Sequence, residues 1–353
     1  MTQFYPLQVQ DVRRETADCV SIAFAVPPDL TEVFRFKQGQ YLTLRAQLEG
    51  EEVRRSYSVC VSPRSGELRI AVKRVPDGRF STFANDRLRV GDTLEVMPPE
   101  GRFFTEVNPD QRKHYVAFAA GSGITPVMSI LSTVLATEPH SRFTLFYGNQ
   151  RTDTIIFREA IEGLKNEHLQ RLSVHHILSR EHTGSELFSG RIDGEKCAVF
   201  FDRLLDPLDV DEYFLCGPQA MILAVRDALL ERGVDRKHIH LELFGTDQAQ
   251  GGPRKQHPEA VAAVIHLTLD GNTLTFPMAN AEDSILDAAL RQGADLPFAC
   301  KGGVCCTCRA RIEEGKVEMD VNYALEPEEV EAGYVLTCQS HPLTPEVRVN
   351  FDQ

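Results

Sequence analysis

Four cysteines in the last quarter of the chain constrain its fold more than any other feature. Cys300, Cys305 and Cys308 are spaced C-x4-C-x2-C, and 29 residues separate Cys308 from Cys338. Two irons need four thiolates in one small volume, so three from a tight loop and one from a distant segment suit a 2Fe–2S cluster. Segment 301–304 contains two glycines, which tolerate positive φ and expose their N–H groups to the sulfurs. These four cysteines are therefore the predicted metal ligands.

Two other interpretations of the cysteines stay open at this stage, a structural zinc site and a set of unrelated core thiols. Zinc sites usually take two C-x2–4-C pairs, whereas this segment has one such pair and an isolated cysteine. Cys306 lies inside the loop but out of register, so we expect a spare thiol there. Nine cysteines without a visible secretion signal favour metal ligands or free thiols over disulfides.

Length and charge limit the classes of protein that remain. At about 150 residues per domain, 353 residues predict two or three domains. The net charge of −13 argues against partners such as nucleic acid or an anionic membrane. Residues 261–353 hold 15 acidic and 6 basic residues, so the C-terminal module is acidic. Without a signal peptide or a long apolar run, we expect a cytoplasmic protein that no membrane holds.

The pattern of apolar residues changes twice along the chain. Up to about residue 104, short alternating apolar runs separated by turn residues predict an antiparallel β-barrel. From His114 on, continuous apolar runs alternate with helical segments, as in an α/β domain with a parallel sheet. The polar stretch after it has no apolar period, and a small α+β fold follows. The predicted boundaries are 1–108, 109–247, a linker at 248–260, and 261–353.

Three segments carry residue types that suit nucleotide cofactors. In segment 55–58, an arginine can hold a pyrophosphate, a tyrosine can cover a flavin face, and a serine can reach the flavin N5. Segment 78–82 precedes a helix expected over 82–88, whose N-terminal N–H groups could bind a phosphate. Segment 121–126 follows a buried strand and opens a helix, the context of a nucleotide-binding loop. Taken singly, each segment could equally be ordinary strand or core structure.

Together these segments resemble the ferredoxin–NADP reductase superfamily. The resemblance lies in R-x-Y-S at 55–58, G-x-G-x-x-P at 121–126 and C-G-P at 216–218, while the turn at 98–103 departs from the family pattern at Pro98. Residues 260–353 resemble a plant-type ferredoxin domain of β-grasp fold. The full domain order resembles the reductase components of multicomponent oxygenases. The resemblance implies FAD, NADPH and a 2Fe–2S cluster as cofactors and a di-iron oxygenase as the protein that accepts the electrons.

The resemblance also implies individual site residues. Those expected at the hydride-transfer centre are Ser58, Cys216, Glu242 and Phe244. Those expected to bind cofactors are Arg55, Tyr57, Ser58, Val72, Lys73, Gly78, Ser81, Thr82, Gly121, Ser122, Gly123, Ile124, Thr125, Pro126, Arg151, Ser179, Arg180, Cys216, Gly217 and Pro218.

The choice of nucleotide depends on the loops after the second and third strands of the parallel sheet. Arginines there suit a 2′-phosphate and an acidic residue suits a free ribose hydroxyl. Arg151 and Arg180 therefore favour NADPH, and Glu181 is the residue that argues the other way. Three other functions stay open: a reductase for a steroid or aromatic hydroxylase, a redox sensor, and a diaphorase with a merely structural ferredoxin module.

Overall fold

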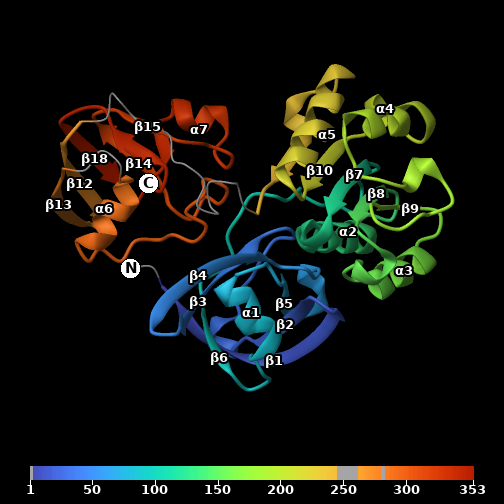
Figure 1. The fold of residues 1–353 in the computed structure, drawn as a ribbon, viewed down its shortest axis with the longest axis horizontal. Helices are drawn as coiled ribbons and strands as arrows, with labels where there is room; N and C mark the ends of the chain where they lie inside the picture. The colour runs from blue at the N-terminus through green and yellow to red at the C-terminus, as the bar shows by residue number, and fades with distance from the viewer. Residues whose placement is uncertain (1–2, 245–260, 280–282) are drawn as a thin grey trace. The chain divides into compact units, whose positions relative to one another are not determined.

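The computed structural model describes residues 3–244, 261–279 and 283–353 (Figure 1). By their contacts these residues form two compact units, of which one is Tyr5–Glu242 and the other comprises the described residues outside that range. The predicted linker at 248–260 lies outside the described residues. Within the described part, no helix is long and apolar enough to span a membrane.

The first unit begins with an antiparallel six-stranded sheet of order β4-β3-β6-β1-β2-β5. Its strands are β1 (Tyr5–Thr16), β2 (Cys19–Ala25), β3 (Tyr41–Leu48), β4 (Glu51–Ser58), β5 (Leu68–Lys73) and β6 (Thr93–Val96). Helix α1 (Arg79–Asp86) packs Phe80 and Ala84 into the same buried core as the strands. The predicted helix over 82–88 therefore begins three residues earlier than expected.

An α/β domain follows in the same unit, with a parallel five-stranded sheet of order β11-β10-β7-β8-β9. Its strands are β7 (His114–Ala120), β8 (Arg142–Asn149), β9 (Leu172–Leu178), β10 (Glu212–Cys216) and β11 (Ile239–Glu242), and its helices are α2 (Ile124–Thr137), α3 (Arg158–Glu167), α4 (Gly194–Arg203) and α5 (Gln219–Glu231). Helices α2 and α3 cover one face of the sheet, and α4 and α5 the other (Figure 1). The strand order reverses between β7 and β10, and ligands of open α/β sheets bind at the carboxyl ends of such a pair.

The barrel and the α/β domain share one hydrophobic core. Cys19, Cys60 and Ala71 from the barrel side belong to the same buried cluster as Ile124 and Val127 of α2. A hydroxyl hydrogen bond adds to it, since Ser129 Oγ donates to the Val61 carbonyl at 2.6 Å. This shared core fixes the barrel against the α/β domain.

The second unit is a mixed sheet of order β13-β12-β18-β14-β16, with a separate pair β15-β17. Its elements are β12 (Ala263–Leu269), β13 (Asn272–Met278), α6 (Ile285–Arg291), β14 (Arg309–Glu314), β15 (Val317–Met319), α7 (Pro327–Glu331), β16 (Tyr334–Leu336), β17 (Ser340–Pro342) and β18 (Glu346–Asn350). β12 pairs in parallel with β18 and antiparallel with β13. Ser284 caps α6 by accepting a hydrogen bond from Asp287 N–H, as expected of a serine N-cap. This unit has a core of its own.

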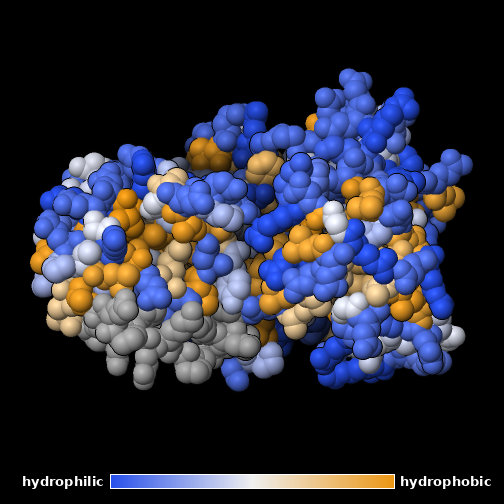
Figure 2. Space-filling model, turned by 90° about the horizontal axis from the view of Figure 1, so that it is seen from above, coloured by the Kyte–Doolittle hydropathy of each residue, from blue (hydrophilic) through white to orange (hydrophobic). Residues whose placement is uncertain are grey.

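All three predicted fold classes are confirmed: an antiparallel β-barrel, an α/β parallel-sheet domain and an α+β module. On the face shown in Figure 2, hydrophilic side chains are interspersed with small apolar patches, which is ordinary for a folded protein.

Candidate functional site

The loops after β7 and β10 touch each other backbone to backbone at the reversal of strand order. A Cβ atom added to Gly123 would lie 2.1 Å from the carbonyl oxygen of Cys216, and one added to Gly217 would lie 3.1 Å from the backbone nitrogen of Ala120. A side chain at Gly123 would clash with the backbone, and one at Gly217 would be tight against Ala120 and Met221. The two glycines therefore let the predicted nucleotide loop and the C-G-P segment, which ends in Pro218 before α5, meet at one edge.

The rest of the predicted nucleotide loop offers mainly backbone to a ligand. Ile124, Thr125 and Pro126 are buried, and Gly121 has a φ of +54°. The Thr125 hydroxyl donates to the Ser122 carbonyl at 3.0 Å, which tightens the first turn. Because the N-terminal N–H groups of a helix attract negative charge, this end of α2 fits a nucleotide phosphate.

Three of the four predicted hydride-centre residues lie together at that edge. Ser58, the last residue of β4, donates a hydrogen bond from Oγ to Oε2 of Glu242 at 3.1 Å. Cys216 pairs with Glu242 in register across β10 and β11. Phe244 belongs to the other compact unit and is 43% exposed, so its contact with a flavin stays a prediction.

Burial disfavours charge on this cluster. Burial raises the pKa of Glu242 to about 8, although the hydrogen bond from Ser58 works in the opposite direction. Burial also raises the pKa of the Cys216 thiol, and the nearby Glu242 raises it further. The cluster thus contains a thiol, a hydroxyl and a carboxyl group. Of these three, the carboxyl group can hold or release a proton near physiological pH.

The β4 wall carries the predicted flavin contacts. The Arg55 side chain is exposed and donates to the neighbouring Arg54 carbonyl at 2.7 Å. The half-buried Tyr57 ring lies 5.5 Å from the Phe80 ring of α1, centroid to centroid, and burial raises the pKa of its phenol. An arginine fork and a fixed aromatic ring on one strand fit a dinucleotide with a planar ring system.

The N-terminus of α1 shows why its start was mispredicted. The Ser81 hydroxyl accepts from Val75 N–H and donates to the Gly78 carbonyl, both at 3.1 Å, so it closes the first turn of the helix. A Cβ on Gly78 would lie 2.5 Å from Ser81 Oγ, so a side chain there would displace the Ser81 hydroxyl. Gly78, Arg79 and Thr82 line a small hollow at this helix end, together with the acidic residues Glu49 and Asp77, and Arg79 is already paired with Glu51.

Val72 and Lys73 end β5 and behave differently. The Val72 side chain is fully buried in the barrel core, so only its backbone could contact a cofactor. Lys73 reaches toward the nucleotide loop: its Nζ would lie 3.8 Å from a Cβ built on Gly121 and is 3.7 Å from a carboxylate oxygen of Asp18. Lys73 thus links the barrel to the α/β edge, a proximity that the sequence gives no means of seeing.

The loops after β8 and β9 run side by side. Ser179 N–H donates to the Asn149 carbonyl at 2.9 Å and Arg180 N–H to the Gln150 carbonyl at 2.8 Å. Arg151 Nε donates to Asp153 at 3.0 Å, so the charge of this arginine is already paired. Among the described residues no carboxylate lies within ion-pair distance of the exposed Arg180. Of the two predicted arginines, Arg180 is therefore the one with its charge available.

The four predicted ligand cysteines gather in two pairs. Cys305 Sγ lies 3.1 Å from Cys300 Sγ, and Cys308 and Cys338 hydrogen-bond through their thiols. The partner thiol and burial raise the pKa of Cys305 and Cys308, whereas the Cys305 thiol and the Gly302 N–H lower the pKa of Cys300.

This pairing bears on the kind of metal centre. In the described part of the chain, no three His, Cys, Asp or Glu side chains are gathered around one point as the ligands of a single metal ion. A structural zinc ion needs four ligands around one point, whereas a two-iron cluster shares its four thiolates between two metals. Two thiol pairs therefore fit a 2Fe–2S cluster better than a single zinc ion. Cys306 is outside both pairs and donates to the Ala324 carbonyl at 3.2 Å.

Gln339 is a site residue that the sequence did not single out. Its side-chain amide donates to the Lys301 carbonyl at 3.0 Å and to Cys338 Sγ at 3.4 Å, so it ties the cysteine loop to the distant fourth cysteine. Its place next to Cys338 was the one available signal. Hydrogen bonds of this kind orient thiolates and tune a cluster.

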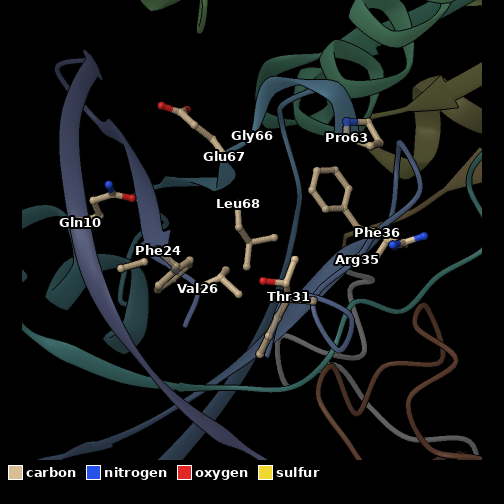
Figure 3. Close-up of a pocket in the computed structure, with 12 residues that line it drawn as sticks. Gln10, Phe24, Val26, Thr31, Arg35, Phe36, Pro63, Gly66, Glu67 and Leu68 are labelled. Carbon is tan, nitrogen blue, oxygen red and sulfur yellow. The ribbon is translucent and has the colours of Figure 1, made fainter. Parts of the chain in front are cut away.

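A separate hollow of about 510 Å³ lies on the barrel, and none of its lining residues is a predicted site residue (Figure 3). Leu68, Phe36 and Pro63 point into it, and Arg35 and Glu67 lie at its rim. Its lining includes none of the residues that form the cluster around Ser58.

Comparison with known proteins bears directly on this arrangement. Residues 6–105 match an oxidoreductase FAD-binding domain, residues 118–227 an oxidoreductase NAD-binding domain, and residues 267–343 a 2Fe–2S iron–sulfur cluster binding domain. One of the subunits of 1,2-phenylacetyl-CoA epoxidase from Escherichia coli K12 is 47% identical over 100% of this chain and 99% of its own. The chain belongs to the ferredoxin–NADP reductase family of oxygenase reductases.

Two further relatives of this oxygenase reductase also match it over nearly its whole length. The ferredoxin reductase component of 3-ketosteroid-9-alpha-monooxygenase from Rhodococcus rhodochrous is 36% identical over 98% of this chain and 96% of its own. The solved structure of phthalate dioxygenase reductase matches with a TM-score of 0.60 at 22% identity, over 99% of this chain and 98% of that one, which supports the fold.

These findings confirm the predicted family, the enzyme class and the FAD, nicotinamide and 2Fe–2S cofactors. The predicted domain boundaries, the individual site residues and the preference for NADPH stay predictions.

Proposed function

We propose that this reductase takes a hydride from NADPH and passes electrons through FAD and its 2Fe–2S cluster to a di-iron oxygenase, that of phenylacetyl-CoA epoxidation. The observation that carries this proposal is the 47% identity to the Escherichia coli epoxidase protein over the whole chain, all three domains included. We also propose the domain limits 1–108, 109–247 and 261–353, and the predicted site residues with the roles that follow.

The chemistry that the bound cofactors supply is hydride acceptance at the flavin and one-electron transfer at the cluster. The protein's part is to hold and orient. Arg55 would hold the FAD pyrophosphate and Tyr57 would pack on the flavin ring. Ser58 and Glu242 would hold a proton beside the reacting face, since Ser58 Oγ donates to the Glu242 carboxyl at 3.1 Å.

The contact between the loops after β7 and β10 supports the nicotinamide position. With Gly123 against the Cys216 carbonyl and Gly217 against Ala120, both loops border one narrow edge next to Ser58 and Glu242. Hydride transfer needs the donor atom of the nicotinamide and the acceptor atom of the flavin to lie about 3–3.5 Å apart. Loops this close to β4, which carries the predicted flavin contacts, can hold a nicotinamide at such a distance.

NADPH is the proposed donor because Arg180, next to the end of β9, pairs with no carboxylate of the described residues. A guanidinium suits a 2′-phosphate. Cys300, Cys305, Cys308 and Cys338 would hold the cluster, two on each iron, as their pairing supports.

The proposal is tested by an anaerobic titration of the purified protein with NADPH, followed by visible absorption and low-temperature EPR. Flavin and cluster should both be reduced, with a 2Fe–2S signal in the EPR spectrum. Flavin reduction with the cluster still oxidised at equilibrium would mean either that the cluster potential lies too low for NADPH or that the ferredoxin unit is outside the electron path.

The acceptor needs a second test, because the steroid monooxygenase reductase at 36% identity favours another candidate. The protein should be added in turn to the oxygenase components for phenylacetyl-CoA and for a 3-ketosteroid, and product formation followed. Turnover with the steroid oxygenase but not with the epoxidase would overturn the proposed acceptor and leave the electron path intact.

A further inference from the structure

The two loops that follow β8 and β9 are joined by side chains as well as by backbone. The short turn η4 (Thr152–Thr154) follows β8, and Glu181 lies three residues after β9. One carboxylate oxygen of Glu181 accepts from Thr152 N–H at 2.7 Å, and the other accepts from Thr152 Oγ1, also at 2.7 Å. Both oxygens of this carboxylate are therefore engaged on the neighbouring loop.

These hydrogen bonds keep Glu181 charged. The Thr152 N–H and hydroxyl lower the pKa of its carboxyl group. A carboxylate that faces the adenosine ribose recognises its 2′-hydroxyl and repels a 2′-phosphate, and the two hydrogen bonds bring Glu181 from the loop after β9 onto the loop after β8. The negative charge of Glu181 would repel the 2′-phosphate of NADPH, and Glu181 is the residue next to Arg180. The place where the Glu181 carboxylate is held therefore decides whether it interferes with the binding of NADPH.

We propose that Thr152 is a positioning residue for nucleotide specificity: by binding both oxygens of Glu181, it holds that carboxylate on the η4 turn and leaves Arg180 to meet the 2′-phosphate of NADPH. The inference rests on the proposed NADPH donor and deepens it. Without the Thr152 hydroxyl, Glu181 keeps one of its two hydrogen bonds and gains freedom to pair with Arg180 or to face the ribose. Either movement disfavours NADPH, and the second favours NADH.

The test is a double-mutant cycle on the full-length protein, with kcat/KM for flavin reduction by NADPH and by NADH as the readout. Thr152→Val removes the hydroxyl at nearly constant shape and should lower the NADPH-to-NADH ratio about tenfold. Thr152→Ser should restore the wild-type ratio. In a Glu181→Gln background, Thr152→Val should change the ratio little, because the charge that it releases is gone. The kcat at saturation and the flavin absorption should stay unchanged throughout.

Thr154→Val is the matched control. The Thr154 hydroxyl donates to the Arg151 carbonyl at 2.7 Å and accepts from Arg151 N–H at 3.1 Å, so it supports the same turn without touching Glu181. A ratio change in Thr154→Val equal to that in Thr152→Val would overturn the inference, because disorder of the turn would then explain both.

The outcomes separate the inference from the function on which it rests. A wild-type protein that prefers NADH would overturn the proposed donor and the inference together. A wild-type protein that prefers NADPH, with effects of Thr152→Val and Glu181→Gln that simply add, would overturn the role of Thr152 alone.

Discussion

The two compact units differ in how their parts are held. In Tyr5–Glu242 the barrel and the α/β domain share buried residues, and Ser58 from one hydrogen-bonds Glu242 from the other. The ferredoxin unit is closed on itself, with Cys308 and Cys338 among its own buried residues. Hydride transfer needs reacting atoms nearly in contact, and the domains that match FAD-binding and NAD-binding models lie in one compact unit. Transfer of single electrons to and from a cluster needs no such contact, and the domain that matches a cluster-binding model lies in the separate unit.

This contrast predicts that damage to one unit should leave the other working. Replacement of Cys338 by serine removes one of four thiolates and should abolish the cluster, with complete loss of the 2Fe–2S EPR signal and of electron supply to the oxygenase. FAD content and NADPH-dependent ferricyanide reduction should stay within about twofold of wild type, because in the described part of the chain the ferredoxin core and the flavin barrel core are separate sets of buried residues. Loss of FAD together with the cluster would contradict the separation.

The reverse experiment damages the first unit. In Gly123→Ala the new Cβ would meet the Cys216 carbonyl oxygen at 2.1 Å, and the loops after β7 and β10 would have to separate. We expect a loss of about 3 kcal/mol in stability and a fall of about 100-fold in the rate of flavin reduction by NADPH. The EPR signal after chemical reduction with dithionite should be unchanged. A near-normal rate would mean that this close contact is not needed for hydride transfer.

An effect that depends on pH is expected from the cluster of Ser58, Cys216 and Glu242. Burial raises the pKa of Glu242 to about 8, which favours the neutral carboxyl below that pH and the ionised form above it. A negative charge there opposes the negative charge that a flavin gains on reduction, and the rate of flavin reduction should therefore fall as the pH rises through about 8. Stopped-flow measurements from pH 6 to 10 check this.

Two variants sharpen that measurement. Glu242→Gln cannot ionise and should give a flat profile across pH 8. Ser58→Ala removes the hydrogen bond to Oε2 and should lower the rate by about 10²-fold at neutral pH, the range for loss of a positioned proton-transfer group. A profile in Glu242→Gln identical to that of wild type would assign the pH dependence to another group.

The sequence predicted the features that depend on neighbours in the chain. The spacing of Cys300, Cys305 and Cys308 predicts the iron–sulfur module, and the continuous apolar runs from His114 on predict the parallel-sheet domain, whose first strand is β7 (His114–Ala120). The start of α1 was wrong, because the hydrogen bonds of Ser81 to Val75 and Gly78 extend the helix backwards by three residues.

Features that depend on distant neighbours could not be predicted from the residues alone. The hydrogen bond of Gln339 to the Lys301 carbonyl joins positions 38 residues apart, and Ser58 and Glu242 are separated by 184. The resemblance to a family named the second pair, but no pattern in the chain gives a distance between them. The pairing of Arg151 with Asp153 is local, yet arginine composition alone gave both arginines equal weight.

The smallest effect that we predict separates those two arginines. Arg180→Ala should raise the KM for NADPH about tenfold, since a charge-assisted hydrogen bond to phosphate is lost, and should change the KM for NADH little. Arg151→Ala should have the weaker effect on NADPH, because Asp153 already binds that guanidinium. Steady-state kinetics with both nucleotides, at two salt concentrations, measures this, since weakening by salt marks a charge interaction with solvent access. Equal increases for NADPH and NADH in Arg180→Ala would show that Arg180 contacts a part common to both nucleotides, and the preference for NADPH would then need another source.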